Sequence, residues 1–203
     1  MIVKAHRAVA FVLIAFIILH LASHLLSLAG PQKHLAMLPL IRPIYRGSFT
    51  EPVLIALLVV QIGLGLTLSW QRRKVGIDRV WGRLQIASGL YIAFFLLLHT
   101  SAALSARYGS HLDTNFWWPA STLAHPTMRF FFYPYYFLAV VAVFSHLAAA
   151  LHFRGTRSSL VRLLALSGPV IALLILAGFG GLFHQFSVPA PYLAAFDTNP
   201  GPQ

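Results

Sequence analysis

Five apolar stretches of about 20 residues each, the length that a membrane crossing needs, run through this chain of 203 residues. A helix rises about 1.5 Å per residue, so each stretch is long enough to span the hydrocarbon core of a bilayer. Together the stretches leave little sequence for a soluble domain. We therefore predict an all-α integral membrane bundle of five transmembrane helices, at about residues 8–28, 52–70, 84–105, 132–153 and 163–183.

Composition supports this fold class. Apolar residues make up 58% of the chain and charged residues only 9%, whereas soluble proteins average about a quarter charged residues. We expect residues 1–186 to form one bundle and residues 187–203, which are rich in proline, to form a non-helical external tail. The first span follows Lys4 and Arg7 as in a signal sequence, but its length and the lack of a convincing cleavage site predict a retained signal anchor. The absence of cysteine excludes disulfides, thiolate-bound haem and iron–sulfur clusters bound by this chain.

The basic residues are divided unevenly between the two ends of the predicted spans. With the amino terminus and the even-numbered loops on one side, ten lysines and arginines fall on that side and five on the other. The positive-inside rule then predicts a cytoplasmic amino terminus and an external carboxyl terminus. This bias accounts for the net charge of +11, so we expect membrane lipid, and no nucleic acid, as a partner. The ten are Lys4, Arg7, Arg72, Arg73, Lys74, Arg79, Arg83, Arg154, Arg157 and Arg162, and the five are Lys33, Arg42, Arg46, Arg107 and Arg129.

Histidines lie inside three of the predicted spans: His20 and His24 in the first, His99 in the third and His146 in the fourth. Hydrocarbon offers no water, so each ring needs a partner within the protein. His20 and His24 follow the last basic residue before their span by 13 and 17 residues, and His99 follows its own by 16. These three are therefore expected at similar height in the outer half of the bilayer. The fourth span runs the other way, which places His146 toward the cytoplasm.

The matched depth of His20 and His99 predicts a shared site. Neutral imidazole is a good axial ligand for haem iron, and imidazoles from two facing helices can clamp one macrocycle. Back along the third span from His99 lie Gly89, Ser88 and Gln85, whose small and polar side chains let helices approach closely or leave width for a planar ligand. The competing interpretation is that each histidine makes only an interhelical hydrogen bond.

Five sequence segments carry a family resemblance. They are KAHRA before the first span, FIILHL within it, QIGLGL in the second, RLQIASGLYIAFFLLLH in the third and VVAVFSHLAAALHF in the fourth. In this order, over residues 4 to 155, the chain resembles the five-helix dihaem cytochrome b subunit that anchors succinate dehydrogenases and fumarate reductases. The fifth span matches by hydropathy only.

In that family four histidines bind two haems. The resemblance implies that His20 and His99 hold the outer haem and that His146 is one ligand of the inner haem, whose other ligand position is occupied by Gln61. Glutamine is a poor haem ligand because its amide oxygen is weakly basic and its nitrogen has no available lone pair. We therefore expect one haem b, with a second at His146 left open, in a free-standing or differently partnered cytochrome. The resemblance also implies the cytoplasmic (inner) membrane of a bacterium.

The choice between His20 and His24 stays open at this stage, because they lie one turn apart on the same face of a helix. One binds iron while the other bonds a propionate, a quinone or a backbone carbonyl. Haem propionates need cations near the membrane boundary. Arg107 lies two turns beyond His99 on the outer side, and the alternative for every arginine there is an interfacial anchor.

Glu51 is the only glutamate, placed in SFTEP where the second span begins at the outer face. A purely structural role would account for Glu51: Thr50 caps the helix, and the acid in the first turn complements the helix dipole. The functional alternative is a catalytic proton acceptor for a quinol beside the outer haem. Four further histidines are expected outside the spans, with spacings that match no metal motif: His34, His111, His125 and His184.

These features predict a membrane b-type cytochrome that transfers electrons between its haem and a quinone pool. Whether the chain is itself a quinone-linked oxidoreductase or a non-catalytic membrane subunit, and whether it has a redox partner protein, stays open. The alternatives are a dihaem anchor subunit of a succinate dehydrogenase or fumarate reductase, a non-redox membrane scaffold and a small transporter. The transporter class is disfavoured because Gln61 is the main polar group near the midplane.

Overall fold

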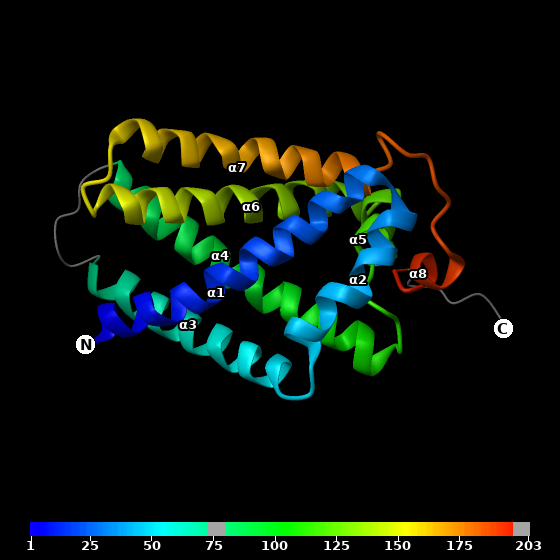
Figure 1. Ribbon diagram of the computed structural model, residues 1–203, viewed down its shortest axis with the longest axis horizontal. Helices are drawn as coiled ribbons and strands as arrows, with labels where there is room; N and C mark the ends of the chain where they lie inside the picture. Colours follow the sequence, from blue (N-terminus) through cyan, green and yellow to red (C-terminus); the bar gives the residue numbers. More distant parts are fainter. Residues whose placement is uncertain (73–79, 197–203) are drawn as a thin grey trace.

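The computed structural model describes residues 1–72 and 80–196, which fold into helices with no strand among them (Figure 1). Five helices are long and apolar enough to cross a membrane, which confirms the predicted fold class. Each begins earlier than its apolar stretch because polar residues at the membrane boundary continue the helix. They are α1 (Ile2–Leu25), α3 (Thr50–Arg72), α4 (Trp81–Leu104), α6 (Arg129–His152) and α7 (Ser158–Phe179).

Shorter helical elements connect and cover these spans. They were not expected from the sequence, since each is too short or too polar to resemble a span. The most important is α2, which starts at the Gly30–Pro31 step, where Gly30 has a φ of 93° and proline occupies the first helical turn. The elements are η1 (Leu26–Ala29), α2 (Pro31–Arg46), the π-helical η2 (Ser105–Gly109), α5 (Trp117–Ala124) and α8 (Ala190–Ala194).

The tail contains α8, so the expectation that residues 187–203 are non-helical is wrong for this part. Pro189 caps the helix and Pro191 lies in its first turn. Proline is tolerated there because the backbone N–H groups of the first turn make no hydrogen bond within the helix. Tyr192 is buried, and its hydroxyl donates to the carbonyl of Asp113 at 3.0 Å. Residues 197–203 lie outside the described residues, as do Arg73, Lys74 and Arg79 of the charge argument.

The five long helices pack as a closed ring. Helix α1 contacts α3 and α7, α4 contacts α3 and α6, and α6 contacts α7. Helices α1 and α4, both fully described, face each other across the interior, where no α carbon of one lies within 8 Å of an α carbon of the other. The space between them is therefore bridged by side chains alone. The amino terminus lies at the opposite end of the ring from α2, α5 and α8 (Figure 1).

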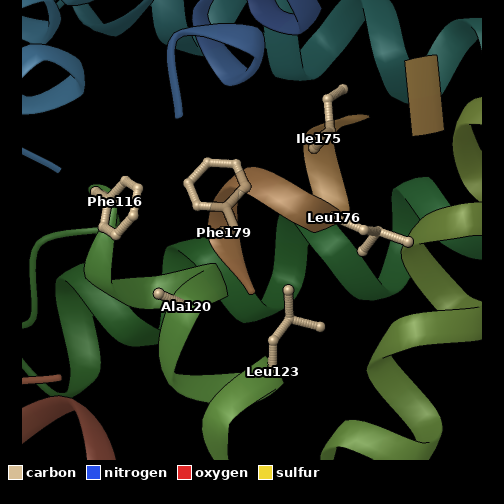
Figure 2. Close-up of a cluster of buried hydrophobic side chains, with 6 residues drawn as sticks. All are labelled: Phe116, Ala120, Leu123, Ile175, Leu176 and Phe179. Atoms are coloured by element: carbon tan, nitrogen blue, oxygen red, sulfur yellow. The ribbon is translucent and has the colours of Figure 1, made fainter. Parts of the chain in front are cut away.

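The tightest packing lies at the end of the ring where α7 finishes. A cluster of buried side chains joins α5 and α7 there, and Figure 2 shows it as Phe116, Ala120, Leu123, Ile175, Leu176 and Phe179. Next to it, a Cβ placed on Gly178 would lie 2.9 Å from the backbone carbon of Ser27. Only glycine allows η1 to approach α7 so closely. This end of α1 is thus fixed against α7.

Candidate functional site

Four histidines converge beside this packed end of the ring. His20 and His24 lie one turn apart on α1, with ring centroids 4.3 Å apart. His99 of α4 reaches across the interior to within 6.1 Å of the His20 centroid. His34 of α2 lies 6.4 Å from the His24 centroid. The structure thus brings His20, His24 and His99 together, as their predicted depth required, and adds His34.

Aromatic neighbours hold the two central rings. Phe16 stacks on His20 with centroids 5.3 Å apart, and Phe95 stacks on His99 at 4.9 Å. Each phenylalanine precedes its histidine by four residues, which places the pair on one helix face. Tyr45 of α2 meets Phe16 edge-on at 5.5 Å. Both imidazoles are therefore oriented by packing and face each other between α1 and α4.

The His20–His99 pair fits a planar metal cofactor. An imidazole nitrogen binds a first-row metal at about 2 Å, so two rings on opposite sides of one iron have centroids roughly 6 Å apart, close to the observed 6.1 Å. No α carbon of α1 lies within 8 Å of an α carbon of α4, so the two rings meet across the interior without direct backbone contact between their helices. The Nδ1 atom of His20 is buried without a hydrogen-bond partner. The residues present thus suit a haem held by two histidines.

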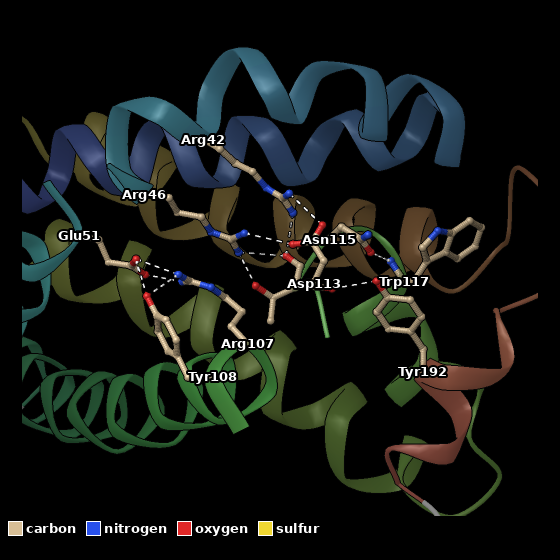
Figure 3. Close-up of polar contacts among 10 residues, drawn as sticks. Arg42, Arg46, Glu51, Arg107, Tyr108, Asp113, Asn115, Trp117 and Tyr192 are labelled. Atoms are coloured by element: carbon tan, nitrogen blue, oxygen red, sulfur yellow. Dashed lines mark hydrogen bonds and ion pairs between the residues drawn. The ribbon is translucent and has the colours of Figure 1, made fainter. Parts of the chain in front are cut away.

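Positive charge lies beside this pair at the end of α2. Figure 3 shows Arg42 and Arg46 sharing the single carboxylate of Asp113, at 2.9 and 3.3 Å. Arg46 also donates to the carbonyl of Thr114 at 3.2 Å, and its charge acts on the His20 ring. Two guanidinium groups on one carboxylate leave an excess positive charge, which an anionic group such as a carboxylate can pair with.

Arg107 forms an ion pair with Glu51, a contact that the sequence did not predict. Its guanidinium binds both carboxylate oxygens of Glu51, one of them at 2.8 Å, and Tyr108 donates to the same carboxylate at 3.4 Å (Figure 3). The π-helical turn η2 carries both Arg107 and Tyr108, and such turns often occur at functional sites. Arg129 lies beside Phe130 with its guanidinium 5.1 Å from the ring centroid, as expected of an interfacial anchor.

Glu51 borders a groove at the end of the ring where α3 begins and α4 finishes. The groove has a volume of about 410 Å³ and is lined mainly by apolar atoms. Ser48, Glu51 and Tyr108 are the polar side chains of its lining, and Leu104 is one of the apolar ones. A flat, largely apolar molecule with one or two hydrogen-bonding groups matches such a lining. The lining consists of Gly47, Ser48, Glu51, Pro52, Ile55, Ala56, Leu104 and Tyr108.

His146 packs against the small-residue face of α4 that the sequence indicated. Its Nδ1 donates to the carbonyl of Gln85 at 3.1 Å and lies 3.3 Å from the Ser88 hydroxyl. A Cβ on Gly89 would lie 3.0 Å from the His146 ring, so the glycine makes room for the imidazole. His146 thus contacts Gln85, Ser88 and Gly89, so this face of α4 is directed at α6 and not at the His20–His99 pair.

Gln61 lies opposite a histidine that sequence reasoning missed. Its amide nitrogen is 3.3 Å from Nε2 of His6, at the start of α1, and its Oε1 is buried without a partner. A Cβ on Gly65, one turn along α3, would lie 3.5 Å from the same ring. The KAHRA segment contained this histidine, but only the crossing of α1 over α3 shows what it contacts. Gln61 and His146 therefore belong to different contacts.

His34 lies outside the five long spans, as expected, but it is buried within the protein and is not a surface histidine. Only 2% of the residue is exposed, because α2 folds back over the end of the bundle with His34 and Leu38 on its inner face. Phe116 and Phe179 meet its ring at 5.4 Å. Burial, assisted by the charge of Arg42, lowers the pKa of His34 to about 4, so the imidazole is neutral at physiological pH.

The other three outer histidines have structural contacts or remain at the surface. His125 accepts backbone hydrogen bonds from Thr127 and Met128 at the start of α6, both at 3.2 Å. His184 donates to the carbonyl of Leu28 at 3.1 Å, and His111 is exposed. Within residues 1–72 and 80–196, no three histidine, aspartate or glutamate side chains converge as a metal site.

Comparisons with protein-family models, with curated proteins and with solved structures find no match for this chain. Membership of the cytochrome b superfamily, which the sequence motifs imply, therefore stays a prediction. The functional argument rests on the arrangement of the residues themselves, and above all on the His20–His99 pair.

Proposed function

We propose that this protein is a membrane b-type cytochrome that holds one haem between His20 and His99. The observation that carries the proposal is the pair itself, which bridges two helices of the ring at the spacing of two axial ligands. A bound haem supplies reversible one-electron chemistry. We place the chain as a divergent member of the cytochrome b superfamily named above, in the cytoplasmic membrane of a bacterium.

The surrounding residues have defined roles in this proposal. His20 and His99 bind the iron, Phe16 and Phe95 fix the planes of their rings, and Arg46 pairs with a propionate. His20 is assigned in preference to His24 because the His20 ring meets His99, with centroids 6.1 Å apart, whereas the His24 ring packs against Phe179 at 5.3 Å. These contacts support His20 as the ligand where the sequence left both histidines open.

The electron partner in this proposal is a quinone. Its flat ring suits the apolar groove beside Leu104, and Glu51 accepts a proton when a quinol is oxidised there. Each quinol would release two protons and two electrons. A bound haem would accept one electron at a time and would have to pass the first to a redox partner protein before accepting the second. The groove opens at the outer end of the spans, where released protons reach water.

The inner contacts favour one haem over two. His146 Nδ1 is bonded to Gln85, and Gln61, which occupies the other ligand position that the resemblance implies, is bonded to His6. This supports a monohaem cytochrome over a dihaem dehydrogenase anchor. A non-redox scaffold, in which histidines serve only as interhelical hydrogen bonds, is the second candidate, and the His146 contact is the observation in its favour.

Haem content tests the proposal. We expect the purified protein to contain one b-type haem per chain with a low-spin, bis-histidine absorbance spectrum. A pyridine haemochrome assay, normalised to protein by amino-acid analysis, measures the ratio. No haem would favour the scaffold, and two haems would favour the dihaem anchor.

Membrane orientation provides a separate test. The ten-to-five division of basic residues predicts a cytoplasmic amino terminus and an external carboxyl terminus. Alkaline phosphatase fused after Gln203 should be active, because this enzyme folds only outside the cytoplasm. Green fluorescent protein fused at the same position should not fluoresce, because it does not fold after export by the Sec pathway. The reverse pattern would overturn both the orientation and the placement of the haem in the outer half.

A further inference from the structure

The pair formed by His24 and His34 has no role in the proposed haem site. The two histidines come from α1 and α2 and meet beside the aromatic cluster at the end of α7. Nδ1 of His24 and both ring nitrogens of His34 are buried without hydrogen-bond partners. Leaving buried polar atoms unpaired is costly, so these nitrogens point to a missing ligand.

The spacing of the two rings indicates a single bridging atom. Their centroids are 6.4 Å apart, and their planes differ by only 18°. A direct hydrogen bond between two imidazoles would place the centroids roughly 5 Å apart. One metal ion bound at about 2 Å by a nitrogen of each ring would place them roughly 6 Å apart.

The space around this pair excludes a macrocycle, in contrast to the His20–His99 pair. Helices α1 and α2 are in direct contact. Phe116 and Phe179 lie 5.1 Å from each other and 5.4 Å from the His34 ring. Phe179 also meets His24 at 5.3 Å. The two helices in contact and the two phenylalanine rings thus surround the pair closely, which suits a small ligand such as a bare ion.

The charged residues near His34 favour a monovalent over a divalent ion. Arg42 is the charged group whose field reaches His34, and Asp113 pairs with it at 2.9 Å. The aromatic walls provide no carboxylate to offset a divalent ion, so a monovalent ion is far less costly to bury. Imidazole nitrogen is a suitable ligand for copper, and copper(I) accepts two ligands in a line.

We propose that His24 and His34 form a copper(I) site, separate from the haem. This inference does not rest on the proposed cytochrome function, because neither histidine is assigned to haem iron. Its failure is distinguishable from failure of the haem proposal, since copper and haem are counted by different assays.

Metal loading of the full-length protein in detergent tests this site. Copper(I) is added anaerobically with a reductant, excess metal is removed by a chelator, and metals are counted by mass spectrometry. We expect one copper per chain in addition to any haem iron. X-ray absorption of the loaded wild type should show two nitrogen neighbours. No retained copper, or zinc retained in preference to copper, would overturn the proposal.

Two substitutions of nearly equal volume identify the ligand. His34→Leu should lower retained copper about tenfold or more, because a ligand is lost, while His34→Met should retain it through a thioether. His111→Asn removes an exposed histidine, tolerates the positive φ at that position and should leave copper unchanged. Equal retention by the Leu and Met variants, or loss in the His111 variant, would contradict the assignment. If the Leu variant does not fold, the X-ray absorption result on the wild type decides.

Discussion

His99→Ala abolishes the low-spin haem spectrum of the purified protein, whereas His146→Ala leaves most of it in place. This contrast is the largest effect that we expect. His99 is the imidazole that reaches across from α4 to His20, and removal of an axial ligand leaves the iron with at most one protein ligand. His146 is instead bonded to Gln85 and Ser88 of the neighbouring helix. Absorbance and electron paramagnetic resonance spectra of the two variants measure the difference.

The same experiment distinguishes the two histidines of α1. His20→Ala should behave as His99→Ala does, and His24→Ala should retain a low-spin spectrum. Circular dichroism and gel filtration show whether each variant is folded. Loss of the spectrum in His24→Ala with His20→Ala unaffected would reverse the ligand assignment. Equal loss in His146→Ala would indicate a second haem in the inner half.

Glu51→Gln slows reduction of the haem by a quinol analogue about tenfold or more, since a positioned proton acceptor typically contributes about 10²–10⁴ in rate. Glutamine keeps the size of the side chain and can still contact Arg107, but it cannot take a proton at neutral pH. Haem content should not change. Stopped-flow absorbance at the haem band measures the rate, and the extent of reduction by dithionite provides the control.

An unchanged rate in Glu51→Gln would show that Glu51 acts only as the partner of Arg107, joining the start of α3 to the end of α4. If no quinol analogue reduces even the wild type, the quinone part of the proposal fails while the haem part stands. A Tyr108→Phe variant refines the result. It removes the phenol hydroxyl from the groove and leaves the Glu51–Arg107 ion pair in place.

The sequence was sufficient to predict the spans and the convergence of His20 with His99. Both follow from local rules: apolar length sets a span, and the rise per residue sets depth. The burial of His34 was not predictable in this way. A histidine after the end of a span is ordinarily external, and only the return of α2 over the bundle places it beside His24. The Gly30–Pro31 step marks where that return begins.

Long-range pairings escaped the sequence for a different reason. The Glu51–Arg107 contact joins residues 56 positions apart, and the Gln61–His6 contact joins residues 55 apart. Such pairs depend on which helices become neighbours and on how they cross. The sequence identified each of Glu51, Arg107 and Gln61 as noteworthy, but it offered Arg107 only as a partner of a propionate or as an interfacial anchor, and not as the partner of Glu51.

The order in which the helices are synthesised has a consequence for assembly. The ring closes where α7 meets α1 and η1, and α7 is the last long helix to emerge from the ribosome. Until α7 inserts, the side of the bundle between α1 and α6 stays open to lipid. A flat apolar molecule dissolved in the bilayer can enter laterally during that interval without any helix having to separate. Once Gly178 of α7 packs against Ser27 of η1, a molecule entering by the same route would have to separate these two elements. We expect cofactor loading to occur during biogenesis and exchange in the finished protein to be slow.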